Sequence, residues 1–89
     1  MTLRGYAKKY DILNGVGYTY QFENGYGASV VKHSGSYGSE KGLYEIAVLD
    51  SDGDLCYSTP ITDDVIGYAN EDKVLDTLHR IKSLWTFFT

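Results

Sequence analysis

Three aspartates on alternate positions form the cluster with the clearest chemical potential in this sequence. Residues 48–57 read VLDSDGDLCY and carry the carboxylates Asp50, Asp52 and Asp54. A helix–loop–helix calcium loop takes oxygen ligands at positions 1, 3 and 5, glycine at position 6 and a bidentate glutamate at position 12. Counted from Asp50, positions 6 and 12 are Leu55 and Ile61. The pattern therefore favours a tight turn, with Asp50 accepting local hydrogen bonds and Gly53 left-handed; weak cation binding stays open as an alternative.

A glycine-rich loop, SGSYGSEKG at residues 34–42, resembles a phosphate-binding loop only in composition. A Walker loop would need glycine at position 36 and lysine at position 42, where this chain has Ser36 and Gly42. The better interpretation is a flexible connecting loop. Loops carry binding residues disproportionately, so Tyr37 is a candidate contact for a partner.

The sequence gives only weak support for nucleophilic, acid–base or zinc chemistry. One cysteine, Cys56, and two histidines, His33 and His79, fall short of a four-ligand zinc site without carboxylates. The neighbours Asp63 and Asp64 diverge by roughly 100° in a helical turn, so they favour capping over convergence on one proton or ion. We therefore expect no enzymatic activity, no cofactor and no metal.

Length and composition indicate one globular domain over residues 1–89. Hydrophobic residues make up 43% of the chain and charged residues 22%, which is typical of globular proteins. The single cysteine allows no internal disulfide, and nothing indicates an oxidising compartment. The N-terminus lacks the apolar run of a signal peptide, and no segment reaches the ~20 apolar residues that span a bilayer. We expect a cytoplasmic protein without a membrane partner.

Charge is distributed unevenly along the chain. Residues 40–72 carry nine acidic residues against one lysine, a net charge of −8, while residues 1–39 and 73–89 each carry +2. An acidic middle segment disfavours direct nucleic-acid binding, since nucleic acids are polyanions. It favours a basic partner or serves solubility.

The clearest local signal is a hairpin at Asn24-Gly25. Both residues tolerate positive φ, which makes the pair a strong two-residue turn signal. Upstream, apolar residues recur at every second position: Val16, Tyr18, Tyr20 and Phe22. A two-residue turn predicts that Tyr20 faces Ser29 and that Tyr18 faces Val31, whereas a longer loop would turn over the faces of one strand.

Three further segments have strand patterns. Residues 43–49 are apolar at nearly every position, which is typical of a central strand. Residues 54–58 are predicted to return from the turn at Asp52-Gly53. Residues 3–14 fit an edge strand protected by Lys8 and Lys9, with a following turn at Asn14-Gly15.

Helical signals occupy the C-terminal third. Residues 62–67 predict one helical turn, capped by Thr62 and closed by Gly67. A longer helix is expected from about residue 71 to residue 83 or beyond, capped by Asn70. Its apolar stripe comprises Val74, Leu75, Leu78, Ile81, Leu84, Trp85 and Phe88. The fold class is therefore α+β, a small antiparallel sheet of three to five strands with one C-terminal helix packed on one face.

Two stretches, GYGASVVKHSGSYGSEKGLYEIAVLD and CYSTPITDDVIGY, resemble a group of small proteins encoded in many tailed-bacteriophage genomes. The resemblance covers about residues 18–67 and leaves out the basic N-terminus and the aromatic C-terminus. The group has no settled activity, so the resemblance implies phage origin more than function. Small non-virion phage proteins often bind and redirect host proteins, including antiviral defence complexes.

The first hypothesis is a non-enzymatic phage accessory protein in the host cytoplasm. It would bind a host protein through an acidic face and inhibit a defence or nucleic-acid-handling complex. The partner-binding candidates are Asp50, Asp52, Asp54, Asp63, Asp64, Tyr37, Trp85 and Phe88.

Two alternatives stay open. The second hypothesis is a self-associating structural module that forms a homo-oligomer through the aromatic end of the C-terminal helix. The third is a small-ligand binder that uses the 34–42 loop with Tyr18, Tyr20, Tyr37 and His33. For the sheet tyrosines the core interpretation is favoured, because aromatic residues at period two are typical of a sheet core.

Overall fold

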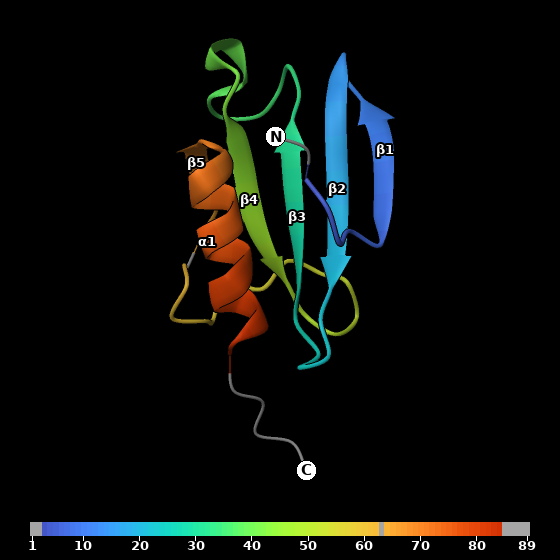
Figure 1. Ribbon diagram of the computed structural model, residues 1–89, viewed down its shortest axis with the longest axis vertical. Helices are drawn as coiled ribbons and strands as arrows, with labels where there is room; N and C mark the ends of the chain where they lie inside the picture. Colours follow the sequence, from blue (N-terminus) through green and yellow to red (C-terminus); the bar gives the residue numbers. More distant parts are fainter. Residues whose placement is uncertain (1–2, 63, 85–89) are drawn as a thin grey trace.

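Five antiparallel strands lie side by side in sequence order, and one helix covers one face of the sheet (Figure 1). The computed structural model describes residues 3–62 and 64–84. The elements are β1 (Lys8–Ile12), β2 (Gly15–Gln21), β3 (Gly27–Lys32), the 3-10 turn η1 (Ser39–Lys41), β4 (Tyr44–Leu49), β5 (Ile66–Ala69) and α1 (Glu71–Lys82). The predicted α+β class is confirmed. In the described part of the chain no helix is long and apolar enough to cross a membrane.

The first hairpin confirms the edge strand and moves its turn by one residue. Lys8 to Ile12 pair with β2, and β1 forms one edge of the sheet. The two turn residues are Leu13 and Asn14, with φ of 45° and 62°. The predicted turn at Asn14-Gly15 was therefore one residue late. Two positive φ angles are what a two-residue turn needs to match the twist of its strands.

The second hairpin exists, but its predicted register was wrong by one residue. Tyr20 lies opposite Ala28, and Tyr18 lies opposite Val30. The loop has three residues, 23–25, and of these only Gly25 is left-handed, with φ 91°. A three-residue loop with a left-handed last residue is the common alternative to the two-residue turn. Shifting the register by one residue turns the other face of β3 toward the core.

The outer partner of β4 was predicted at the wrong place. Residues 54–58 form no strand; they make an isolated bridge between Leu55 and Leu49, and the N–H of Cys56 donates to Val48 O at 2.8 Å. The fifth strand is β5, whose first two residues, Ile66 and Gly67, end the segment 62–67 that was predicted as a helical turn. Thr62 does make the expected capping bond, accepting from the N–H of Asp64 at 3.1 Å. The chain extends after that bond because β5 supplies hydrogen-bond partners to β4.

The helix α1 is confirmed nearly as predicted. Its N-cap is Asn70, whose side chain accepts a hydrogen bond from the N–H of Lys73 at 2.8 Å. The buried helix residues are Val74, Thr77, Leu78 and Ile81. Leu75 is 41% exposed and does not belong to the stripe.

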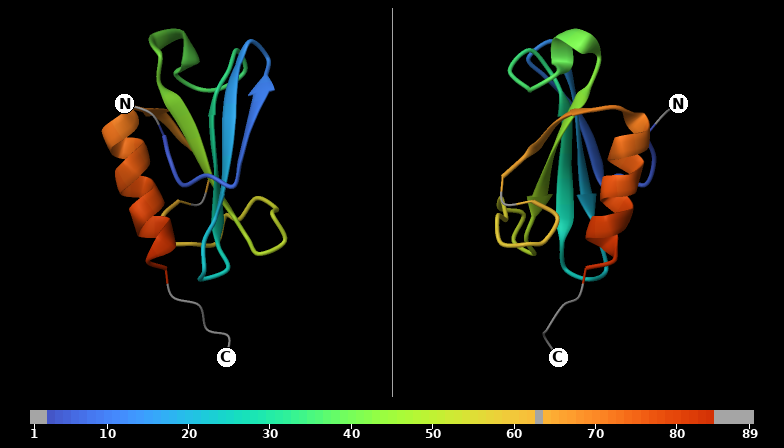
Figure 2. Two further views of the ribbon diagram at one scale, coloured as in Figure 1. Left: turned by 45° about the vertical axis from the view of Figure 1, so that its right-hand side comes forward. Right: turned by 90° about the vertical axis from the view of Figure 1, so that its left-hand side faces the viewer.

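The core lies between α1 and one face of β2, β3 and β4 (Figure 2). Alternate strand residues fill it: Tyr18, Tyr20, Ala28, Val30, Tyr44, Ile46 and Val48. Tyr18 and Tyr20 are 6% and 2% exposed, which confirms the core interpretation of these two rings. Both rings are therefore packed in the core between the sheet and α1.

Two hydroxyl groups of the described core have no hydrogen-bond partner, Tyr20 Oη and Thr77 Oγ1. Burial raises the pKa of Tyr20 above its ordinary value. An unpaired buried hydroxyl is destabilising because it has lost its hydrogen bonds to water. We predict that Thr77→Val raises the free energy of unfolding by about 1 kcal/mol in urea titrations, since it keeps the shape and removes the hydroxyl. Thr77→Ser, which keeps the hydroxyl and removes the methyl, should lower it; the opposite ranking would contradict the prediction.

Candidate functional site

Asp50 organises the acidic turn that follows β4. Its Oδ1 accepts hydrogen bonds from the backbone N–H of Asp52 at 2.9 Å and of Asp54 at 3.0 Å. Its own N–H donates to Asp54 O at 2.8 Å, and the N–H of Gly53 donates to Asp50 O at 3.0 Å. Gly53 has φ 84°. The turn interpretation is confirmed in both of its parts, the accepting role of Asp50 and the left-handed glycine.

The same turn gathers three carboxylates at one point. One oxygen from each of Asp50, Asp52 and Asp54 lies within 4.8 Å of the others. Asp52 and Asp54 are exposed, and Asp50 is half-buried. Carboxylates at this separation repel one another, so a cationic group placed between them is favoured. The turn is therefore a concentrated source of negative potential.

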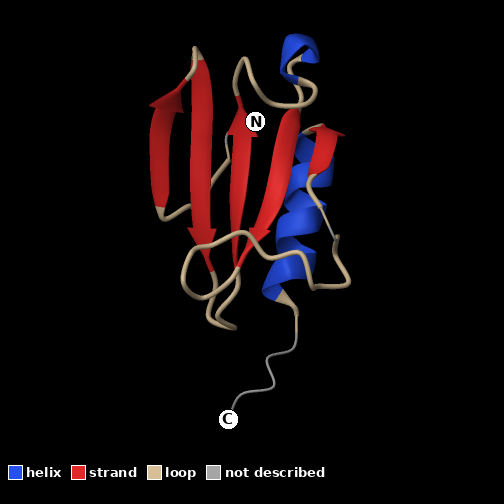
Figure 3. Ribbon diagram, turned by 180° about the vertical axis from the view of Figure 1, so that it is seen from behind, coloured by secondary structure: helices blue, strands red, loops and turns tan. Residues whose placement is uncertain are grey.

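This acidic turn borders the face of the sheet that lies away from α1, which we call the open face. Figure 3 shows the open face, with the segment between β4 and β5 crossing its lower end. The strand register places Tyr10 beside Gly17 and Val31 there, and Thr19 beside Ser29 and Ala47. Small residues at Gly17, Ser29 and Ala47 leave room above the backbone of the open face.

Where the open face meets the acidic turn there is a cavity of about 390 Å³, which we call the acidic groove. Its walls include Tyr10, Thr19, Ser29, Leu49, Asp50, Asp54 and Leu55. No basic side chain lines it among the described residues. An aromatic ring, two leucines and two carboxylates together suit a side chain with an apolar stem and a cationic end.

Of the other predicted acidic pair, Asp63 and Asp64, the structure describes only Asp64. Asp64 is exposed and is not one of the groove's lining residues. Asp63 lies outside the described residues, as do the predicted contacts Trp85 and Phe88. Among the described residues, the structure brings together the carboxylates of Asp50, Asp52 and Asp54.

Tyr37 is presented to solvent by a well-anchored backbone. It is 62% exposed. Its N–H donates to Glu45 Oε1 at 3.0 Å, and its carbonyl accepts from the N–H of Tyr68 at 3.3 Å. A Cβ on Gly67 would lie 2.7 Å from Tyr37 Cβ, so the loop packs directly on β5. The loop at residues 34–42 is consequently held at Tyr37 by hydrogen bonds and close packing.

Tyr68 is an exposed aromatic residue that the sequence did not single out. It is 56% exposed and has φ 53°, a left-handed backbone that costs a residue with a Cβ about 1–2 kcal/mol. It lies in a bulge of β5, where Tyr44 pairs with Ala69 and Ile46 pairs with Ile66. Bulges at a sheet edge commonly redirect a side chain. Tyr68 follows no alternation that a sequence pattern could have revealed.

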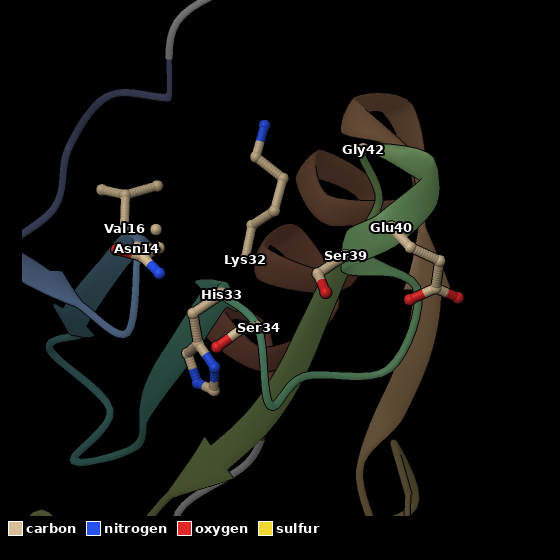
Figure 4. A pocket seen from close by; sticks show the side chains of 9 residues that line it. Asn14, Val16, Lys32, His33, Ser34, Ser39, Glu40 and Gly42 are labelled. Carbon is tan, nitrogen blue, oxygen red and sulfur yellow. The ribbon is translucent and has the colours of Figure 1, made fainter.

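A second cavity, of about 620 Å³, lies where the β1–β2 turn, the end of β3 and η1 meet (Figure 4). Its polar side chains do not converge: Figure 4 shows the Lys32 amino group and the His33 ring pointing to opposite sides and the Glu40 carboxylate pointing away from both. The Lys32 Nζ lies 4.7 Å from the centroid of the Tyr44 ring. His33 Nδ1 accepts from the N–H of Gly35 at 3.0 Å. This cavity offers no assembled site for catalysis or for an anion.

Cys56 and the histidines form no nucleophilic pair in the described part of the chain. The Cys56 sulfur lies 3.6 Å from the Ser58 hydroxyl oxygen and is half-buried. His79 is exposed on the last turn of α1. Neither histidine hydrogen bonds to the thiol, although such a bond is what activates a cysteine through histidine.

Comparisons with protein-family models, with curated proteins and with solved structures find no match to this chain.

Proposed function

We propose that the chain is a non-enzymatic protein-binding module that takes a basic side chain of its partner into the acidic groove. The observation that carries this proposal is the position of the acidic turn. Its carboxylates stand at the border of a cavity of about 390 Å³ on the open face and not on an isolated loop tip. A lysine or arginine entering there would place its stem on Leu49 and Tyr10 and its charge among the carboxylates.

Electrostatics favour such a partner before contact as well as after it. The segment 40–72 carries nine acidic residues against one lysine. A surface of one sign raises the rate of encounter with an oppositely charged partner and disfavours partners of like charge. The partner surface is therefore basic, like the grooves of proteins that bind nucleic acid.

The resemblance to small tailed-bacteriophage proteins makes a bacterial host protein the natural partner, met in the host cytoplasm. Occupying a basic groove would exclude nucleic acid from it, so the consequence of binding would be inhibition of a nucleic-acid-handling or defence complex. Tyr37 and Tyr68, both exposed, add aromatic contact area of the kind that interfaces favour.

The test is affinity capture from lysate of the bacterial host with three forms of the protein. The wild type is compared with Asp52→Lys/Asp54→Lys, which spares the structural Asp50. The matched control is Glu40→Lys/Asp76→Lys, the same charge change at two exposed positions away from the groove. We expect one stoichiometric protein with the wild type and the control, and its loss with the turn variant. Equal capture by all three forms, or no capture by the wild type, would refute the proposal.

A further inference from the structure

The outer edge of β1 is an unpaired strand edge. β1 is the first strand of the sheet, and no described segment lies along its outer side (Figures 1 and 3). α1 packs against β3, β4 and β5, at the other side of the sheet. An open edge is a template for another strand because its N–H and C=O groups point outward.

The hydrogen-bond pattern shows which groups point outward. The N–H of Phe22 donates to Tyr26 O at 2.8 Å, so the even-numbered residues of β2 bond to β3 and the odd-numbered ones bond to β1. Gly15, Gly17 and Thr19 therefore bond to the three β1 residues that face them, Ile12, Tyr10 and Lys8. The intervening residues, Lys9 and Asp11, direct their N–H and C=O groups away from the sheet.

Lys9 and Asp11 carry opposite charges and extend to the same face of the sheet, because they are two residues apart. Lys9 Nζ lies 5.6 Å from the centroid of the buried Tyr18 ring, which places both side chains on the α1 side. Asp11 is exposed. The two residues of β1 that could hydrogen bond to a new strand are therefore one basic and one acidic residue.

We propose that β1 pairs with β1 of a second copy of this chain, antiparallel and centred on Tyr10. In that register Lys9 of each copy faces Asp11 of the other, so two ion pairs accompany the backbone bonds from all four outward-facing residues. The neighbouring registers that keep the hydrogen bonds put Lys9 opposite Lys9 or Asp11 opposite Asp11. Like charges directly opposite are destabilising in a sheet, so the charges select one register.

The pairing has a defined geometry. Residues directly opposite in a sheet extend to the same face, so both helices lie on one side of a continuous ten-stranded sheet and both open faces on the other. The two acidic grooves then face the same direction. Lys9 does not prevent this association, because Asp11 of the other copy lies opposite it; Lys9 disfavours the neighbouring register in which it would face Lys9 of the other copy.

Charge exchange tests the proposal directly. Sedimentation equilibrium is measured from about 10 µM to about 1 mM protein in low salt, since edge-to-edge contacts are small and weak and ion pairs are screened by salt. We expect the wild type to form a reversible dimer. Lys9→Asp and Asp11→Lys should each raise the dissociation constant at least about tenfold, because each replaces two attractive pairs with two repulsive ones.

The decisive arm mixes the two variants. Lys9→Asp with Asp11→Lys in equal amounts should associate as well as the wild type, since every cross-strand pair is then again of opposite sign. Lys8→Asp, the same charge change on the open face of the same strand, is the matched control and should still dimerise. A wild type that stays monomeric throughout, or a dimer that neither single variant weakens, would overturn the proposal, as would a mixture that fails to associate.

Discussion

Replacing Asn24 with aspartate should destabilise the fold by about 3 kcal/mol, although the side chain keeps its shape. Asn24 Nδ2 donates to three carbonyl oxygens at the end of α1: Ile81 O at 2.8 Å, Lys82 O at 3.0 Å and Leu84 O at 3.1 Å. Aspartate removes this donor and leaves the carbonyls without it. It also places a negative charge at the negative end of the helix dipole. Urea titration followed by circular dichroism measures the change.

The matched control makes the same substitution at the other end of the same helix. Asn70→Asp keeps the side-chain oxygen that accepts from Lys73 and puts negative charge at the positive end of the dipole. It should leave stability unchanged or increase it slightly. Asn24→Ala, which loses the donor without adding charge, should fall between the two. Equal losses for Asn24→Asp and Asn70→Asp would show that the contact from Asn24 to the helix contributes little.

Asn24 also explains why the hairpin register differed from the prediction. In the local sequence, Asn-Gly predicts a two-residue turn in which both residues have positive φ. In the fold, Asn24 Oδ1 accepts from the N–H of Tyr26 at 3.0 Å while its amide group binds the helix end. The residue that the sequence assigned to a turn joins two elements far apart in the chain, and no local pattern contains that information.

The elements that were predicted correctly are those with long, regular patterns. Residues 16–22 alternate over a whole strand, and the stripe on α1 repeats over three turns. β5 has only four residues, IGYA, and a bulge with a left-handed tyrosine interrupts it. So short and irregular a strand forms because the edge of β4 offers it N–H and C=O groups to pair with. Its cause is therefore a tertiary contact and not a pattern in its own sequence.

Of the two parts of the acidic groove, the turn could be predicted from the sequence and the cavity could not. The turn at Asp50 follows from local chemistry, since its carboxylate and Gly53 are sufficient to close it. The cavity beside it depends on the register of three strands and on small residues at Gly27 and Ser29. The predicted register was wrong by one residue in this very hairpin, so the open face could not have been assembled from it.

The dimer and the acidic groove are linked by the sheet but stand on separate observations. The charge of the groove comes from the turn after β4, while the proposed dimer depends on Lys9 and Asp11 of β1, the strand whose Tyr10 also lines the groove. Charge reversal at Asp52 and Asp54 should therefore leave self-association intact. If both proposals hold, a dimeric partner would be bound more tightly than a monomeric one, because its second contact is made within the same complex.

Gly15→Ala should lower the free energy of unfolding by about 3 kcal/mol or prevent folding. The size of the loss measures how closely the first two hairpins are packed. A Cβ at Gly15 would overlap Lys32 O and would lie 2.6 Å from His33 Cα and 2.8 Å from Lys32 C. All three atoms are backbone, so no side-chain rotation relieves the clash. The loss is expected as a lower midpoint of urea unfolding with an unchanged slope.

Two other glycines separate the causes of this loss. Gly53→Ala meets no atom within 4 Å but must adopt φ 84°, so it should cost only the 1–2 kcal/mol or so of a left-handed residue. Gly17→Ala meets the ring of Tyr10, a half-buried side chain at the sheet edge that can turn away, so its cost should be smaller than that of Gly15→Ala. If Gly15→Ala cost no more than Gly53→Ala, the close backbone contact between β2 and the end of β3 would be wrong.

That contact holds β2 against β3, and β1 depends on β2 for its own position. Gly15→Ala is therefore expected to disturb the edge that carries Lys9 and Asp11 as well.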